Sequence, residues 1–403
     1  MIAVVVSVQL AASLGYYAVM THVVAHLRDD VGLLAGTIGL ILGVRIAVQY
    51  ALFLPVGALT DLIGAPRVGV LACVLRTAGF ALLGTAGGPA GLLGAAVLLG
   101  TGGALFHPAA QSLLAGTAPA RRDRGFAVYV ITGQIAAVAG PPVGLALLAA
   151  GGDGGGGFGL VTAGAAGTWS IAALLFVLLH LGGATAARPP RNGAAAGARE
   201  LARNVAGVLR DRTFFRFVVV AAPTTLLTEQ TMTVVPLKDV GAGLTTAFLC
   251  LSAAVAASIQ PWCAARGRAG RPRVLRAGLL CSTAVYVLLA LLPGAGPPLA
   301  AGLLAAAVLN GLATGVFQPS VFQSITRHAP AARIGAYLGV YSWCSGLVVF
   351  SGGLGVGHLF DAGPAGAATA LAALAAVALA AAVRCGTGRG HADPISSAGR
   401  YEP

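Results

Sequence analysis

Twelve long apolar blocks separated by short polar connections limit what this chain can fold into more than any other feature. Each block reaches the roughly 20 residues that a helix needs to cross a hydrocarbon core about 30 Å thick. Because lipid offers the backbone no hydrogen-bond partner, we expect every block to be helical despite its glycines and prolines. The predicted fold is an all-α membrane protein with twelve transmembrane helices, at residues 3–26, 33–56, 68–87, 90–115, 125–149, 159–181, 214–236, 243–264, 274–293, 297–324, 335–357 and 363–384.

Composition argues against the other fold classes. The chain is 57% hydrophobic and only 9% charged, whereas a soluble domain has roughly a quarter charged residues. A β-barrel would need alternating strands of about ten residues, and the blocks show no such alternation. No basic leader or cleavage motif precedes the first block, so we interpret 3–26 as a retained helix.

The basic residues predict how the chain is oriented. In a twelve-helix alternation, the connections on one side hold only Arg28 and Lys238, while nearly all of the 25 lysines and arginines lie on the other side. Since basic loops stay cytoplasmic, we expect a multi-pass cell-membrane protein with both termini in the cytoplasm. The net charge of +13 does not indicate nucleic-acid binding, because the arginines are spread over separate loops without interleaved aromatic residues.

Motifs for enzymatic chemistry are not found. The six cysteines form no C-x-x-C pair, so neither a disulfide framework nor a metal site is predicted. With one lysine in the chain there is no phosphate-binding loop of the form G-x-x-x-x-G-K-[ST], and no H-E-x-x-H or G-x-S-x-G motif occurs. We therefore predict no enzymatic activity and no cofactor.

The chain contains an internal repeat. The longest polar interval divides the twelve blocks six and six, and matches such as Gly100 with Gly311 and Phe106 with Phe317 recur at a constant offset of 211. Near the ends of the second and eighth blocks, Pro55 and Pro261 match at an offset of 206. Two parallel repeats of this kind predict pseudo-twofold related bundles with a substrate site between them near the midplane. The predicted domains are a bundle at 1–182, a cytoplasmic loop at 183–213, a bundle at 214–384 and a disordered cytoplasmic tail at 385–403.

The connection after the second block carries a recognisable motif. The run Gly57-Ala58-Leu59-Thr60-Asp61-Leu62-Ile63-Gly64-Ala65-Pro66-Arg67 resembles the G-x-L-x-D-x-x-G-x-x-R signature of the major facilitator superfamily. The resemblance to this family covers nearly the whole chain. It implies that Gly57, Asp61, Gly64 and Arg67 form a latch on the cytoplasmic side. Arg76, nearer the cytoplasmic end of its block, is expected either to join the Asp61 cluster or to snorkel toward the membrane surface. The second half has Gly267 where the first has Asp61, so the latch should be one-sided.

A second motif points to the direction of transport. The run Gly140-Pro141-Pro142-Val143-Gly144 resembles the G-P-x-x-G signature of exporters in the same superfamily. Its alternative role is packing alone, because proline bends a helix and glycine allows a close neighbour. Stretches in the second, third and fourth blocks are similar to a bacterial subgroup of drug/proton antiporters, although the arginine that many relatives carry in the fourth block is missing here. Arg45 is the residue that could replace it.

Ionisable residues inside the blocks are candidates for coupling, because a charge at the bilayer centre costs about 2.5–3.5 kcal/mol. Glu229 is the carboxylate placed well inside the seventh block, and it is expected either to carry protons or to form a static ion pair. Arg45 is its candidate partner or a counter-ion for an anionic substrate. His107, which aligns with Gln318, is expected either to titrate or to hold a packing hydrogen bond.

Further polar and aromatic residues fall at midplane depth. They are candidates for the lining of a substrate cavity, with interhelical hydrogen bonding as the alternative role. With so few charges, the cavity is expected to be mostly apolar and to suit an amphipathic molecule better than a sugar. The candidates are Tyr16, Tyr17, Gln49, Gln111, Gln134, Gln230, Asn310, Gln318 and Trp343.

The sequence therefore predicts a secondary active exporter of small amphipathic organic molecules, either drug-like compounds or natural products, driven by proton antiport. Its expected partners are this small-molecule substrate, protons and the lipid bilayer, and a monomer suffices. Two alternatives stay open. The same fold supports an importer or facilitator of a small metabolite, and a non-transporting membrane receptor or scaffold is the third class.

Overall fold

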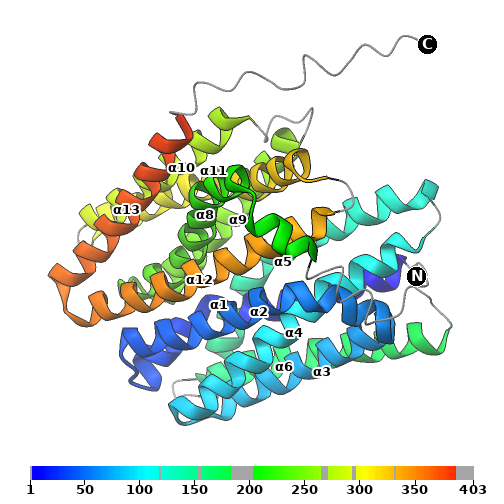
Figure 1. Cartoon of the computed structure of the whole chain (residues 1–403). Coiled ribbons are helices and arrows are strands. Elements are labelled where there is room, and N and C mark those ends of the chain that lie inside the picture. Colours follow the sequence, from blue (N-terminus) through cyan, green and yellow to red (C-terminus); the bar gives the residue numbers. More distant parts are fainter. Residues whose placement is uncertain are drawn as a thin grey trace.

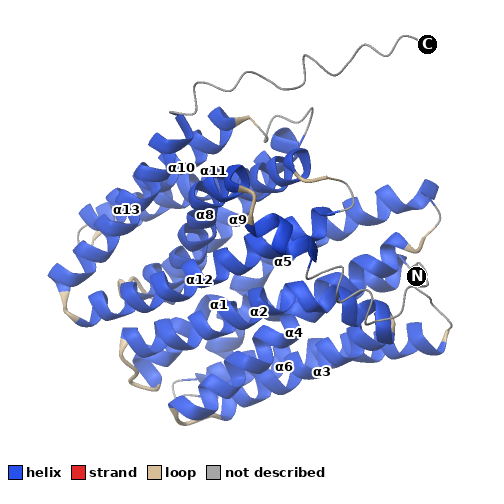
Figure 2. Cartoon of the chain, viewed as in Figure 1, coloured by secondary structure: helices blue, strands red, loops and turns tan. Residues whose placement is uncertain are grey.

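The computed structural model describes residues 2–117, 119–152, 156–182, 203–264, 271–292, 296–330 and 333–386. Throughout these ranges the regular elements are helices, and no strand occurs in them (Figure 2). Residues 387–403 of the predicted tail and most of the predicted central loop lie outside the described residues, while Cys385 and Gly386 belong to the last helix. The all-α fold class is confirmed.

Twelve of the described helices are long and apolar enough to cross a membrane. The first half contains α1 (Ile2–Ala25), the short π-helix η1 (His26–Asp30), α2 (Ala35–Ile63), α3 (Ala65–Thr85), α4 (Pro89–Ala115), α5 (Pro119–Ala150) and α6 (Gly157–Leu181). The second half contains α8 (Arg212–Leu237), α9 (Ala242–Ala264), α10 (Pro272–Leu291), α11 (Pro297–His328), α12 (Ile334–Asp361) and α13 (Pro364–Gly386).

The helices correspond to the predicted blocks, and several are longer. Helix α5 begins at Pro119 and α2 continues to Ile63, whereas the apolar blocks start at 125 and end at 56. Backbone hydrogen bonding does not stop where side chains become polar, so a helix can extend beyond the hydrocarbon zone. Proline occupies one of the first two positions of α3, α4, α10 and α11, where the missing N–H costs nothing.

Both halves are assembled from the same helix pairs. In the first half α3 packs on α4 and α6, α2 packs on α4, and α1 packs on α5 and α6. Adding seven to each label gives α10 with α11 and α13, α9 with α11, and α8 with α12 and α13, which are the observed contacts of the second half. Figure 1 shows the first half, in blue to cyan-green, below the second, in green to red. This equivalence is the pseudo-twofold relationship that the repeat predicts.

The repeated glycines have the same role in both halves. A Cβ on Gly100 would lie 2.4 Å from the carbonyl oxygen of Arg45, so α4 touches the backbone of α2 there. A Cβ on Gly311 would lie 2.6 Å from the carbonyl oxygen of Ser252, so α11 touches α9 in the same way. The residue is glycine in both repeats because no side chain fits between these backbones.

The most extensive contacts between the halves are those of α2 with α12 and of α5 with α9, and α1 makes smaller contacts with α8 and α9. We call the end of the bundle where α1 begins and α13 ends the terminal end, and the other the far end. Toward the far end, α2 and α12 are in backbone contact. A Cβ added to Gly39 of α2 would lie 2.5 Å from the carbonyl oxygen of Gly353. A Cβ added to Gly357 of α12 would lie 2.4 Å from the carbonyl oxygen of Ala35. The two halves therefore meet tightly at the far end.

Candidate functional site

A cavity of about 480 Å³ lies between the halves. Its walls come from α1, α2 and α5 of the first half and from α8, α9, α11 and α12 of the second. It reaches toward the terminal end along α11 and α12, where Phe322 and Leu338 line it. Of the residues proposed from the sequence, it is lined by Tyr17, Gln134, Glu229, Asn310 and Gln318.

Glu229 and Arg45 link the two halves inside this site. Glu229 Oε2, on α8, lies 3.5 Å from Arg45 Nη2, on α2. The Arg45 side chain is 7% exposed and that of Glu229 is 28% exposed. Glu229 is also the one charged residue among the described residues that line the cavity. A carboxylate that is open to the cavity is thus held by a buried cation from the opposite bundle.

A second, smaller pocket lies behind this ion pair. Its volume is about 30 Å³, large enough to hold a water molecule. Glu229 lines both the pocket and the cavity, whereas Arg45, Tyr16 and Gln230 line only the pocket. Tyr16 and Gln230 therefore surround the ion pair rather than the cavity.

Arg76 is buried near Tyr16, the same residue that lies beside Arg45. Its guanidinium carbon is 5.2 Å from the centre of the Tyr16 ring and 5.1 Å from that of Trp169, while Arg45 lies 5.7 Å from the Tyr16 ring. Arg76 is the twelfth residue of α3, about three helical turns from the start of that helix. Arg76 is buried, and no described carboxylate forms a salt bridge with it. Trp169 was not among the sequence candidates.

Four other polar or aromatic candidates do not line the cavity. His107 Nδ1 lies 2.8 Å from the Tyr129 hydroxyl, a contact between α4 and α5. Gln49 lies beside Gly103 and Arg76. Gln111 is exposed, as is Trp343 at 53%, and neither lines the cavity. Both residues lie on membrane-spanning helices, as predicted, but their side chains are on a face of the helix that points away from the cavity.

The motif after the second block is described in part. Gly64 joins α2 to α3 with φ of +88°, a conformation that favours glycine, and Arg67 is exposed at the start of α3. Gly57 and Asp61 belong to α2, but their side-chain surroundings lie outside the described part of the structure. The geometry of the predicted latch therefore stays a prediction.

The Gly-Pro motif of α5 packs against α1. A Cβ on Gly140 would lie 2.5 Å from Tyr17 Cβ, and one on Gly144 would lie 2.4 Å from the Ala18 carbonyl oxygen. His22 Nε2 lies 3.2 Å from the Pro141 carbonyl oxygen. Pro141 itself lines the cavity. The motif thus brings the backbone of α5 close to the helix that carries Tyr16 and Tyr17.

Most of the cavity surface is apolar, as expected from the sequence. Its wall also carries hydroxyl and amide groups that were not among the candidates. Thr224, Thr228 and Thr231 recur on α8 at helical spacing, which is the signal that could have identified this face. The additional polar lining residues are Thr21, Tyr50, Thr224, Thr225, Thr228, Thr231, Ser252, Gln260, Thr314, Tyr341 and Ser342.

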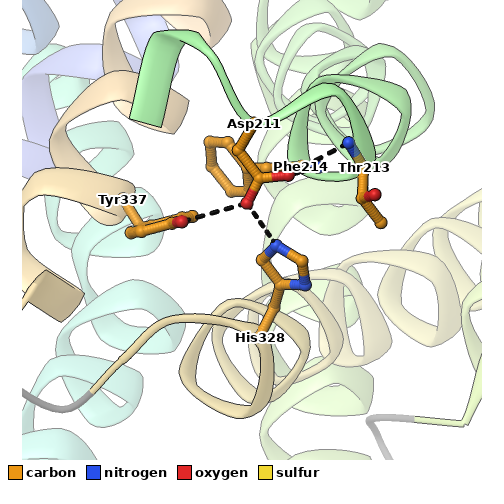
Figure 3. A network of polar contacts seen from close by, with 5 residues as sticks. All are labelled: Asp211, Thr213, Phe214, His328 and Tyr337. Carbon is orange, nitrogen blue, oxygen red and sulfur yellow. Dashed lines mark hydrogen bonds and ion pairs between the residues drawn. The ribbon is translucent and has the colours of Figure 1, made fainter. Parts of the chain in front are cut away.

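A polar cluster at the terminal end ties three helices of the second half together (Figure 3). Asp211 caps α8 by accepting hydrogen bonds from the N–H groups of Thr213 and Phe214, both at 3.0 Å. Its other carboxylate oxygen lies 2.7 Å from His328 Nε2, on α11, and accepts from the Tyr337 hydroxyl, on α12, at 3.0 Å. The hydrogen bonds from Phe214, His328 and Tyr337 outweigh the opposing effect of burial and lower the pKa of Asp211 to about 2.

At the far end, the two basic residues bind helix C-termini. Arg28 donates to the carbonyl oxygen of Leu237, the last residue of α8, and thereby joins the two halves. Lys238 Nζ donates to the Leu289 carbonyl oxygen at 2.8 Å, near the end of α10. Burial lowers the pKa of Lys238. Both cations are placed where the helix dipole favours them.

Comparisons with known proteins agree with this architecture. A model of the Major Facilitator Superfamily matches residues 5–353. An uncharacterized MFS-type transporter of Mycobacterium tuberculosis is 27% identical over 369 residues, which cover 88% of this chain and 84% of that protein. The multidrug resistance protein MdtH of Cronobacter sakazakii is 32% identical over 224 residues, which cover 55% of this chain and 52% of MdtH.

Solved structures share the fold. A POT family transporter in complex with a thioalcohol conjugated peptide superimposes with a TM-score of 0.77 at 14% identity, covering 95% of this chain and 94% of that one. The nucleoside transporter NupG gives a TM-score of 0.77 at 11% identity, covering 95% and 98%. The family model, the twelve spanning helices and the repeated helix pairing all lead to one conclusion: this chain is a multi-pass membrane transporter that belongs to the major facilitator superfamily.

Proposed function

We propose that the protein is a secondary active exporter of small amphipathic organic molecules, driven by proton antiport. The observation that carries the proposal is the ion pair between Glu229 and Arg45. It joins opposite bundles, and its carboxylate faces the cavity. Protonation of Glu229 removes the negative charge, weakens its attraction to Arg45 and loosens a contact that must change when the bundles rock.

The cycle follows from this geometry. In the described conformation the far end is closed by α2 against α12, and the cavity extends toward the terminal end. We place the terminal end in the cytoplasm, because most basic residues lie there. Substrate then enters from the cytoplasm, a bundle rotation exposes it to the far side, and a proton taken up by Glu229 from that side returns with the empty carrier.

Two features support export over import. The Gly-Pro motif at Gly140, Pro141 and Gly144 resembles that of exporters, and the relatives with partial coverage include a multidrug resistance protein.

The cavity combines Phe317, Phe322, Met232 and Leu249 with its polar groups, which suits a molecule with both apolar and polar parts. A monomer contains the complete cavity.

Transport of an amphipathic dye tests the proposal. Purified protein in liposomes is given an inside-acidic pH gradient, and the movement of Hoechst 33342 is followed by fluorescence. The wild-type protein should accumulate the dye only while the gradient lasts, and Glu229→Gln should abolish the gradient dependence. Asp30→Asn is the matched control, because it removes a carboxylate charge that pairs with His26 at the exposed far end.

Each rival predicts a different result. Flux of the dye that persists in Glu229→Gln and ignores the gradient would contradict proton antiport and favour a facilitator. Concentration of solute in the same direction as the proton flow would favour an importing symporter. Liposomes that move no candidate compound, together with a protein that binds the central loop, would favour a receptor or scaffold.

A further inference from the structure

The hydroxyl groups on the cavity wall share a hydrogen-bonding direction. Thr224 donates to the Ala221 carbonyl oxygen at 2.6 Å, Thr228 donates to that of Thr224 at 2.9 Å, and Thr231 donates to that of Thr228 at 2.8 Å. A hydroxyl has one proton and two lone pairs. Because each proton is used within α8, these side chains offer only lone pairs to a molecule in the cavity.

The same direction recurs on the other walls. Thr21 of α1 donates to the Tyr17 carbonyl oxygen at 2.8 Å, and Thr314 of α11 donates to that of Asn310 at 2.9 Å. Ser252 of α9 donates to the Ala307 carbonyl oxygen at 3.0 Å, and Tyr341 of α12 donates to that of Ala221 at 3.3 Å. Acceptor groups thus surround the cavity from five helices.

Charge reinforces this pattern. Glu229 is the one ionisable acid or base, tyrosines aside, among the described residues that line the cavity, and as a carboxylate it is an acceptor only. Arg45, its cation, lines the small pocket behind it instead. A ligand in the cavity therefore meets one negative charge and the lone pairs of these hydroxyls, with the positive charge behind the carboxylate. Donors on the same wall include the side-chain amides of Gln134, Gln260, Asn310 and Gln318, which carry no charge.

We propose that the cavity selects protonated primary and secondary amines that carry an apolar group. The N–H groups of the ammonium ion would donate to the Glu229 carboxylate and to the threonine hydroxyls, and the apolar part would lie against residues such as Phe317 and Leu249. Hydrogen bonds in which one partner is charged are the stronger ones. This inference names the substrate class of the proposed exporter and in that respect rests on it, but binding is measurable without transport.

A set of four ligands with one scaffold tests the inference. The affinities of 4-phenylbutylamine, its N,N,N-trimethylammonium analogue, 4-phenylbutan-1-ol and 4-phenylbutyrate for the full-length protein in lipid nanodiscs are measured by calorimetry, with empty nanodiscs subtracted. The primary amine should bind about tenfold more tightly than the trimethylammonium analogue, which keeps the charge and lacks every N–H donor. The carboxylate should bind most weakly. Equal affinities of the two cations, or tighter binding of the alcohol or the carboxylate, would overturn the inference.

Variants of Thr228 separate acceptor chemistry from shape. Thr228→Val keeps the volume and removes the lone pairs, so the affinity for the primary amine should fall about fivefold while that for the trimethylammonium analogue stays unchanged. Thr228→Ser restores the acceptor and should restore the affinity. Thr369→Val is the matched control, because Thr369 makes the same backbone hydrogen bond on the exposed surface of α13. Equal weakening of both cations in Thr228→Val would show that shape, rather than N–H donation, is recognised.

Failure of this inference differs from failure of the proposed function. Preferential amine binding without gradient-driven flux would uphold the acceptor-lined site and reject the exporter. Gradient-driven flux of the dye, combined with no preference for N–H donors, would uphold the exporter and reject the amine site.

Discussion

Asp361 Oδ1 lies 2.7 Å from the backbone nitrogen of Ala35, so the last residue of α12 accepts a hydrogen bond from the first residue of α2. Its Oδ2 accepts from the N–H of Gly36 at 2.8 Å. A carboxylate from the second bundle thus caps a helix of the first at the far end, where the helix dipole favours negative charge. In the proposed transport cycle this contact must break when the far end opens.

Asp361→Ala should shift the protein toward a conformation that is open at the far end. Loss of a helix N-cap costs about 0.5–2 kcal/mol, which corresponds to a severalfold change in the equilibrium. Ile46→Cys, in a background without the six native cysteines, reports on opening because Ile46 is buried and lines the small pocket. Its labelling by an impermeant maleimide should accelerate severalfold in Asp361→Ala and stay unchanged in the Asp30→Asn control. Equal labelling rates would show that the cap does not hold the far end closed.

The Glu229 and Arg45 pair should be coupled in stability. Glu229→Gln leaves Arg45 buried without its counter-charge and should lower stability by about 1–3 kcal/mol. Removing both charges, in Arg45→Gln with Glu229→Gln, should recover part of that loss, and thermal unfolding in detergent measures the difference. If the loss in the double variant equals the sum of the losses in Arg45→Gln and Glu229→Gln, the two side chains do not stabilise each other.

The charges within apolar blocks could be identified from the sequence because Glu229 and Arg45 stand out at midplane depth. Hydropathy gives the depth of a residue along the membrane normal, but it does not give its rotation about the helix axis. The small residues that fill these helices leave little difference between their faces, so Trp343 was assigned to a cavity that it does not line. The environment of Arg76 depends on Tyr16 and Trp169, which come from α1 and α6, and no local pattern connects these three residues.

The ring of Tyr16 should matter more than its hydroxyl. Both Arg45 and Arg76 lie within cation–π distance of it, an interaction of about 0.5–2 kcal/mol when shielded from water. Tyr16→Phe keeps the ring and should retain most of the thermal stability, whereas Tyr16→Leu should lose several degrees in melting temperature. A larger loss in Tyr16→Phe than in Tyr16→Leu would show that the hydroxyl group, not the ring, holds the guanidinium groups.

Asp211 should make the second bundle sensitive to acid. Its pKa in the folded protein, about 2, lies below the ordinary value of 3.8. The stabilisation by its charge is therefore complete above about pH 4 and is lost as the pH falls through 2. Asp211→Asn keeps a capping oxygen but removes the charge that faces His328 and Tyr337, so wild type should melt at a higher temperature at pH 6, and the difference should shrink toward pH 2.5. A difference that does not depend on pH would exclude a contribution from the carboxylate charge.

Gly100 and Gly311 provide a test of the repeat itself. An added Cβ would meet the Arg45 carbonyl oxygen at 2.4 Å in the first half and the Ser252 carbonyl oxygen at 2.6 Å in the second. Gly100→Ala and Gly311→Ala should therefore both destabilise the protein, by about 1–3 kcal/mol each, since the backbones must move apart. Gly167→Ala on α6 is the matched control, because a Cβ there meets nothing within 4 Å, and it should leave the melting temperature unchanged or slightly raised. Because the two contacts lie in different bundles, the losses should add in the double variant, and a strong loss at one position with none at the other would contradict the equivalence of α4 and α11.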